Sequence, residues 1–320
     1  MNQSIIQISH LKKYFDIPRR GLLHAVDDVN LEIPIRKTLG LVGESGCGKT
    51  TTGLTIVRLY KPTSGKIFFK GKDIFSLKGK ESHNLTKKIQ IIFQDPYSSL
   101  NPKKTIRQIV SEPFIIHNSL ENKYDIEKEV YKLLELTNLP KNILNKFPHE
   151  LDGGHRQTIG IARALALGPE FIVCDEPISA LDVSVQARIL NLLMDLQAKL
   201  NLSYLFITHD LSVVKHISNK IAVMYLGQVV ELAETDEFFN NPLHPYTQAL
   251  LSAIPTINLK GKKERIILKG DVPSPINPNP GCRFFDRCWK ATKECREVDP
   301  VLELKKPDHM VACIHVDSKI

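Results

Sequence analysis

A glycine-rich segment of the chain meets the spacing G-x-x-x-x-G-K-[ST] and so places narrow limits on the fold: Gly43-Glu44-Ser45-Gly46-Cys47-Gly48-Lys49-Thr50. An apolar segment typical of a strand precedes this run, and residues 50–59 have helical character. In such a loop backbone N–H groups surround phosphates, and the helix N-terminus adds partial positive charge. The pattern therefore predicts a phosphate-binding loop in which Lys49 reaches the β- and γ-phosphates and Thr50 binds Mg²⁺.

A second motif follows the apolar segment 171–174, where Asp175 and Glu176 stand together. A carboxylate at the end of a buried strand can hold Mg²⁺ through water, and the next carboxylate can orient or deprotonate an attacking water. By itself an acidic pair after a strand more often begins a helix. Downstream of a phosphate-binding loop it indicates nucleotide hydrolysis, with Asp175 near the metal and Glu176 as the base.

The order of predicted elements indicates an α/β fold. Strand-like segments at 39–42, 171–174, 204–207 and 221–224 alternate with helical ones, which predicts a mainly parallel sheet in a P-loop NTPase core. Residues 4–42 form apolar stretches typical of a β-rich N-terminal subdomain. Strand signals fade over about 96–165, which predicts a helical subdomain. Beyond Pro255 the chain is rich in Pro, Gly and Lys, so we expect a nucleotide-binding domain at 1–255 and an extension at 256–320.

Charge and hydropathy set the expected environment. No apolar run approaches the roughly 20 residues that a bilayer requires. The first residues lack the basic and apolar stretches of a secretion signal, so we expect a cytoplasmic location. The net charge of +8 is spread along the chain among 35 acidic residues and is weak support for nucleic-acid binding.

Further motifs make the chain resemble the ATP-binding subunit of an ABC transporter. In that family's order they are Gln94 in Ile-Ile-Phe-Gln-Asp-Pro, the signature position Leu151-Asp152-Gly153-Gly154-His155, the pair Asp175-Glu176, the loop Ser179-Ala180-Leu181-Asp182, and Thr208-His209-Asp210. The resemblance implies that Gln94 contacts Mg²⁺ and the attacking water, that His209 contacts the γ-phosphate, and that Phe15 stacks on adenine. Tyr14 is the neighbouring candidate for adenine. The nucleotide-binding residues implied, besides Gln94 and Asp175, are Phe15, Gly43, Ser45, Gly46, Cys47, Gly48, Lys49, Thr50, Thr51, Asp152, Gly153 and Gly154.

The signature departs from the family's Leu-Ser-Gly-Gly-Gln, because Asp152 replaces the serine. In the family two subunits face head to tail, and each ATP lies between the phosphate loop of one and the signature of the other. Against a phosphate oxygen about 4 Å away, a carboxylate is repelled by about 4 kcal/mol at an effective dielectric near 20. A good helix cap contributes only about 1 kcal/mol. We therefore expect weak hydrolysis at the site that this signature completes, and a heterodimer with a second, homologous ATPase. The alternative is that Asp152 is tolerated, for example by bridging through a cation.

The C-terminal part narrows the resemblance to the oligopeptide, dipeptide and nickel importers, whose typical segment is similar to residues 241–251. Four cysteines follow at the spacing C-x5-C-x6-C-x17-C: Cys282, Cys288, Cys295 and Cys313. Four thiolates suit Zn²⁺ or an iron–sulfur cluster. The resemblance favours a [4Fe–4S] cluster over zinc, and buried cysteines without a metal are the third possibility.

The sequence therefore predicts a peripheral ATPase on the cytoplasmic face of the membrane that binds ATP and Mg²⁺ and powers peptide import. Implied partners are the second ATPase, two transmembrane permeases and, through the complex, an external peptide-binding protein, with no nucleic acid. A nickel or metal-chelate importer is the alternative. A soluble ABC ATPase acting on nucleic acid or ribosomes fits less well, because such chains usually carry two phosphate loops or a long coiled-coil insertion.

Overall fold

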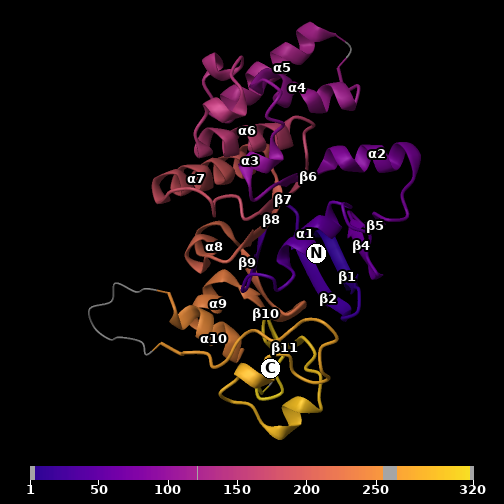
Figure 1. Ribbon diagram of the computed structural model, residues 1–320, viewed down its shortest axis with the longest axis vertical. Coiled ribbons are helices and arrows are strands. Elements are labelled where there is room, and N and C mark those ends of the chain that lie inside the picture. Colours follow the sequence, from indigo (N-terminus) through magenta and orange to yellow (C-terminus); the bar gives the residue numbers. More distant parts are fainter. Residues whose placement is uncertain (1–3, 121, 255–264, 318–320) are drawn as a thin grey trace. The chain divides into compact units, whose positions relative to one another are not determined.

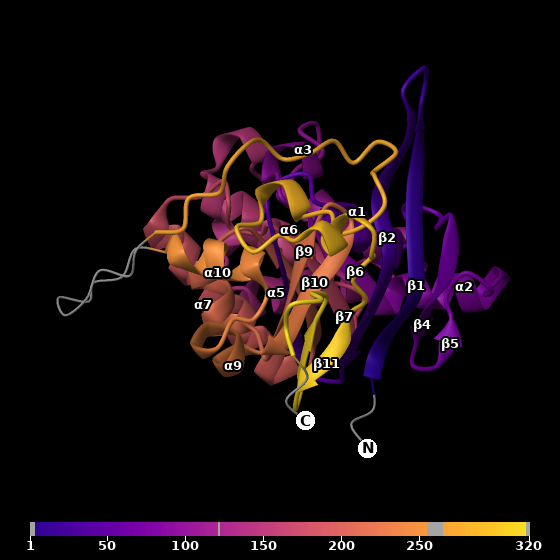
Figure 2. The same cartoon turned by 90° about the horizontal axis from the view of Figure 1, so that it is seen from below.

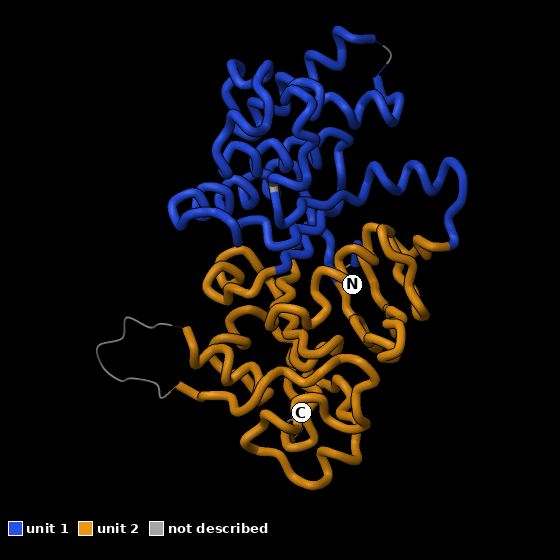
Figure 3. Tube along the Cα trace, in the orientation of Figure 1, with its two compact units in different colours: residues 1–5, 33–37, 76–207 blue, residues 6–32, 38–75, 208–320 orange. Residues whose placement is uncertain are grey.

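The computed structural model describes residues 4–120, 122–254 and 265–317. The chain divides into two compact units, which Figure 3 shows in two colours. The first unit comprises residues 1–5, 33–37 and 76–207, and the second comprises 6–32, 38–75 and 208–320.

The second unit contains the β-rich N-terminal part that the sequence predicts. Its antiparallel sheet has the order β2-β1-β4-β5, and its long strands β1 and β2 run side by side in Figure 2. Ile6 and Ile8 of β1 are both buried, because residues two apart on a strand point to the same face. The strands are β1 (Ser4–Ile17), β2 (Gly21–Pro34), β4 (Ser64–Phe69) and β5 (Lys72–Asp73).

A second sheet of the same unit leads into the phosphate loop. Strand β3 pairs in parallel with β9, and β10, β12 and β11 follow as antiparallel neighbours. All five residues of β3 are buried, as in a strand covered on both faces. The strands are β3 (Thr38–Val42), β9 (Lys220–Tyr225), β10 (Gln228–Glu234), β11 (Glu303–Lys306) and β12 (His309–Val311). The helices are α1 (Lys49–Ile56), α8 (Leu211–Ile217), α9 (Thr235–Asn240) and α10 (Pro245–Ser252), with the 3₁₀ turns η3 (Phe285–Arg287) and η4 (Lys293–Arg296).

The first unit combines three parallel strands with most of the helices (Figure 1). Strand β7 pairs in parallel with β6 and with β8. The strands are β6 (Ile89–Ile92), β7 (Phe171–Asp175) and β8 (Ser203–Thr208). The helices are α2 (Gly79–Lys88), α3 (Pro96–Ser99), α4 (Ile106–Ile116), α5 (Lys123–Leu136), α6 (Gly153–Leu165) and α7 (Val183–Leu200), with the 3₁₀ turns η1 (Lys141–Ile143) and η2 (Pro148–Glu150).

The alternating strands and helices and the presence of a helical subdomain agree with the sequence prediction, whereas the bounds of that subdomain, about 96–165, stay a prediction. Helix α2 was not predicted, because only Leu85 of its ten residues is buried and the segment has no apolar stripe. The domain boundary expected at residue 255 falls in 255–264, outside the described residues, and stays a prediction. Across the described ranges no helix combines the length and apolarity needed to cross a bilayer.

Candidate functional site

Lys49, the lysine of the phosphate loop, lies buried at the first position of α1. Its Nζ donates to the carbonyl oxygens of Gly43 at 2.8 Å and Glu44 at 2.9 Å. The ammonium group is thus held by the loop's own backbone. A triphosphate that entered the loop would offer charged oxygens in place of these carbonyls, and hydrogen bonds between charged groups are stronger.

The loop has room only for glycine at two positions. Gly43 has φ 152° and Gly48 has φ 109°, in the range that other residues avoid. A Cβ at Gly43 would lie 2.1 Å from the carbonyl oxygen of Met224, and one at Gly48 would lie 2.0 Å from that of Ala25. The loop therefore packs directly on neighbouring backbone while Ser45 and Gly46 remain exposed.

The N-terminus of α1 is suited to an anion. Within the described residues no side chain caps this helix, and its first turn has no acidic residue. Thr50 is exposed at its second position. Cys47 is buried beside Lys49, and burial raises the pKa of its thiol, so it serves as a small neutral residue there. These observations fit phosphate and Mg²⁺ binding by the loop.

The acidic pair and the glutamine meet in the first unit. Asp175 is buried at the end of β7, whereas Glu176 is half-buried and has φ 43°. The Glu176 N–H donates to Ile207 at 2.9 Å, which continues the pairing of β7 with β8. Nε2 of Gln94 donates to Oε2 of Glu176 at 2.9 Å. Two residues that the sequence associates with the attacking water are therefore in direct contact.

The histidine of the Thr-His-Asp motif lies in the second unit. His209 is exposed between buried Thr208, the last residue of β8, and Asp210, the N-cap of α8. The N–H of Asp210 donates to Oγ1 of Thr208 at 3.0 Å, and the Asp210 carboxylate accepts from Ser212 N–H at 2.8 Å. These bonds fix the backbone on the C-terminal side of His209.

Asp152 caps helix α6 in the first unit. Its Oδ1 accepts from the His155 N–H at 2.8 Å, and its Oδ2 lies 2.6 Å from His155 Nδ1. The His155 backbone bond, followed by the contacts with the His155 ring, lowers the pKa of Asp152 despite slight desolvation. The side chain is 63% exposed, so water screens the repulsion of phosphate that the sequence predicts. Sequence reasoning missed the partner role of His155, although the Asp-x-x-His spacing of an N-cap and its third helical residue was available.

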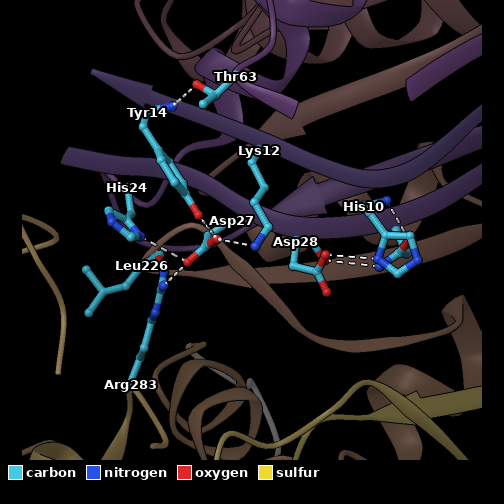
Figure 4. A network of polar contacts seen from close by, with 10 residues as sticks. His10, Lys12, Tyr14, His24, Asp27, Asp28, Thr63, Leu226 and Arg283 are labelled. Atoms are coloured by element: carbon cyan, nitrogen blue, oxygen red, sulfur yellow. Dashed lines mark hydrogen bonds and ion pairs between the residues drawn. The ribbon is translucent and has the colours of Figure 1, made fainter. Parts of the chain in front are cut away.

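The two adenine candidates have different neighbours. Phe15 makes an edge contact with Tyr60 at 5.4 Å between ring centroids and lies under Lys13 Nζ at 4.7 Å. The Tyr14 ring stacks on that of His24 with 4.0 Å between the ring centroids, and the Tyr14 hydroxyl donates a hydrogen bond to the Asp27 carboxylate (Figure 4). Desolvation and this bond to Asp27 raise the pKa of Tyr14. The Tyr14 ring is therefore engaged within the protein, and Phe15 stays the predicted adenine contact.

The four C-terminal cysteines gather around one small cavity of about 20 Å³, which His244, Phe284 and His315 also line. Sγ of Cys295 lies 3.3 Å from Nε2 of His315. Burial raises the pKa of Cys282 to about 11 and also raises the pKa of Cys288 and Cys313. Among the residues that the structure describes, no three His, Cys, Asp or Glu side chains have an arrangement that could hold a metal ion. The donor set suits a soft metal, but these side-chain positions do not form the site.

Comparison with protein families gives two matches. The family described as "ABC transporter" matches residues 26–179, and "Oligopeptide/dipeptide transporter, C-terminal region" matches residues 230–295. Among curated proteins, the oligopeptide transport ATP-binding protein AppF of Bacillus subtilis is 51% identical over 97% of both chains. The dipeptide transport ATP-binding protein DppF of Haemophilus influenzae is 47% identical over 99% of this chain and 98% of its own.

Solved structures give the same fold. A dimeric ATP-binding cassette in a post-hydrolysis state with ADP and phosphate has a TM-score of 0.66 and 27% identity, covering 72% of this chain and 98% of its own. The cbiO1 protein of Clostridium perfringens, part of the ABC transporter complex cbiONQ, has a TM-score of 0.66 and 28% identity, covering 75% and 92%. The α/β ABC ATPase fold expected from the sequence is confirmed.

Proposed function

Because the chain belongs to the family of ABC transporter ATP-binding subunits, in the branch with the oligopeptide/dipeptide transporter C-terminal region, we propose that it hydrolyses ATP to import peptides. The observation that carries the proposal is the extent of the similarity. Curated relatives named for oligopeptide and dipeptide transport are 47–51% identical over nearly the whole chain, including the C-terminal part.

We infer the residue roles from the motifs in the sequence and from the resemblance to the family. Lys49 and the N–H groups of the loop would hold the β- and γ-phosphates. Thr50 would bind Mg²⁺ directly, and Asp175 would bind it through a water molecule. Glu176 would accept a proton from the attacking water, which Gln94 would help to position. His209 would donate to the γ-phosphate. The contact between Gln94 and Glu176 supports this division of roles.

We propose that the working ATPase is a heterodimer of this chain and a second, homologous subunit. The dimeric ATP-binding cassette among the structural relatives supports a dimer as such. Support for two different subunits comes from Asp152, which places a carboxylate where the family has a serine. The Asp152 carboxylate would repel a bound phosphate and so reduce the rate of ATP hydrolysis. Solvent water and the contact with His155 would weaken this repulsion.

We also propose that the assembly docks at the cytoplasmic face of a membrane on two permeases, and that an external binding protein delivers the peptide. The C-terminal cysteines would hold a [4Fe–4S] cluster or, in the alternative, zinc. The convergence of four thiols on one cavity supports a metal there, and binding would require the thiols to move into a tetrahedral arrangement.

The proposal is tested with the full chain in its native membrane complex. Co-purification with permeases supports import, whereas co-purification with ribosomes or DNA in their place would overturn it. The purified complex is then reconstituted in liposomes with its binding protein. We expect labelled oligopeptide or dipeptide to accumulate only with ATP. Accumulation of nickel or a metal chelate without peptide uptake would establish the alternative substrate.

A further inference from the structure

Glu44, the second residue of the phosphate loop, forms hydrogen bonds with three other residues of the second unit. Its carbonyl oxygen accepts from Lys49 Nζ at 2.9 Å, and its N–H donates to the hydroxyl of Tyr246 in α10 at 2.9 Å. Its carboxylate takes two hydrogen bonds from Arg287, at 2.7 Å from Nη1 and 3.0 Å from Nη2. Two of the three contacts come from residues more than 200 positions further along the chain.

The contact with Arg287 has the geometry of a strong ion pair. Both terminal nitrogens of the guanidinium face both oxygens of the carboxylate, the fork arrangement that combines charge with fixed direction. The Arg287 side chain is only 9% exposed and that of Glu44 27%, so water screens the pair less than it screens a surface pair. Hydrogen bonding to Glu44, opposed by desolvation, raises the pKa of Arg287.

The backbone around Arg287 fixes the direction of its side chain. Arg287 ends the turn η3, in which the Phe285 N–H donates to Cys282 at 2.9 Å and the Cys288 N–H donates to Phe285 at 3.2 Å. The preceding Phe284 is buried with its ring 5.3 Å from that of Tyr225 and 5.4 Å from that of Tyr246. The turn is therefore packed against the same aromatic group that contacts the phosphate loop.

The charge of Glu44 makes this contact matter for nucleotide binding. An ATP phosphate chain carries several negative charges, and an uncompensated carboxylate in the loop that receives it would repel it. A Glu44 that moved to reach water would also shift the carbonyl oxygen on which Lys49 rests. The guanidinium of Arg287 opposes both the repulsion and the shift, since it neutralises the Glu44 carboxylate and restricts the rotation of that side chain.

We propose that Arg287 is a positioning residue for ATP binding, acting from the C-terminal segment through Glu44 and assisted by the hydroxyl of Tyr246. The C-terminal segment that contains η3 then contributes to the ATP site through Arg287. The inference requires that the loop binds ATP and is independent of what the transporter carries.

The test compares binding of a fluorescent ATP analogue by the full chain and its variants in the presence of Mg²⁺. We expect Arg287→Ala to weaken binding about tenfold, because it leaves Glu44 charged and unpaired. Glu44→Gln combined with Arg287→Ala should return the affinity to within about threefold of the unmodified chain, since the repelling charge is gone. Arg287→Lys should fall between the two, because it keeps the charge and loses the fork.

A matched control is Arg296→Ala, which removes an exposed guanidinium that lies on the ring of Phe285 in the same segment and leaves Glu44 paired. It should bind the analogue like the unmodified chain. If Arg287→Ala does not fold, Arg287→Lys decides, since it should weaken binding by itself and lose less affinity when Glu44→Gln is added. The proposal is overturned if Arg287→Ala or, where only it folds, Arg287→Lys binds with unchanged affinity. It is also overturned if adding Glu44→Gln fails to restore binding.

Discussion

Nε2 of Gln94 donates a hydrogen bond to Oε2 of Glu176 at 2.9 Å, joining a residue two positions beyond the end of β6 to the residue that follows β7. The two strands are parallel neighbours, so their carboxyl ends bring these side chains to the same edge of the sheet. The amide fixes the direction of the carboxylate that is proposed to act on the attacking water. Gln94 is exposed and Glu176 half-buried, so a water molecule can reach both.

Gln94→Ala should lower kcat for ATP hydrolysis about tenfold, because an unheld carboxylate orients water poorly. The Kd for ATP should change little, since the phosphate loop is untouched. Steady-state ATPase of the assembled transporter and equilibrium ATP binding measure the two quantities. The matched control is Gln90→Ala on β6, which removes a side chain bonded to the Thr86 carbonyl and should leave kcat unchanged. Equal losses in both variants would contradict a special role for Gln94.

Asp152 allows its charge to be separated from its capping role. Asp152→Ser keeps a side-chain oxygen for the His155 N–H and removes the carboxylate, so ATPase of the assembled pair should rise while the melting temperature stays the same. Asp152→Ala removes the cap as well and should cost about 1 kcal/mol of stability. ATPase assays and thermal unfolding report these effects. Unchanged hydrolysis after Asp152→Ser would mean that the carboxylate is tolerated at the site.

A buried histidine predicts a pH dependence of stability. Burial, opposed by the charge of Glu231, lowers the pKa of His244 to about 4, and its Nδ1 accepts from the Tyr246 N–H at 3.1 Å. In the unfolded chain the pKa is about 6.5, so below that pH the unfolded state binds more protons. The stability contribution is complete above pH 6.5 and falls as the pH drops towards 4, by about 3 kcal/mol in all.

His244→Asn keeps an acceptor at the N-cap of α10 without a group that titrates in this range. Denaturant unfolding at pH 7, 6 and 5 should therefore show a shallower loss of stability than in the unmodified chain. The exposed His216 of α8 offers the control, because His216→Asn should keep the original slope. An identical slope in the His244 variant would show that this histidine is not the group responsible.

Metal content tests the cysteine cavity. Full chain purified without oxygen should contain iron and sulfide with a broad visible absorbance, and Cys295→Ser should remove both, because it replaces one of the four thiolates. Cys47→Ser changes a thiol of the phosphate loop and should leave the metal content intact. A colourless protein with one zinc ion per chain would contradict the iron–sulfur proposal. A protein without metal would show that the four cysteines are unligated thiols.

Local sequence patterns were enough to predict most of the fold and much of the candidate site. The phosphate loop, the acidic pair and the alternating elements depend on neighbours within a few residues, so spacing alone reveals them. The contacts of Glu44 with Arg287 and of Asp27 with Arg283 join residues 243 and 256 positions apart. Nothing in the local sequence of either arginine distinguishes it from one in a solvated loop, because only the packing of η3 brings them to their partners.

We expect Glu176 of this chain to support the ATP hydrolysis that drives peptide import. Uptake of labelled peptide is measured in liposomes containing the complete transporter, with Glu176→Gln beside Glu170→Gln. Glu170 precedes the same strand and pairs with Lys88 at 3.5 Å, so it controls for the loss of a carboxylate. We predict that Glu176→Gln lowers uptake and peptide-stimulated ATPase about a hundredfold while Glu170→Gln keeps both. Uptake at the unmodified rate in the Glu176 variant would show that this carboxylate has no part in ATP hydrolysis.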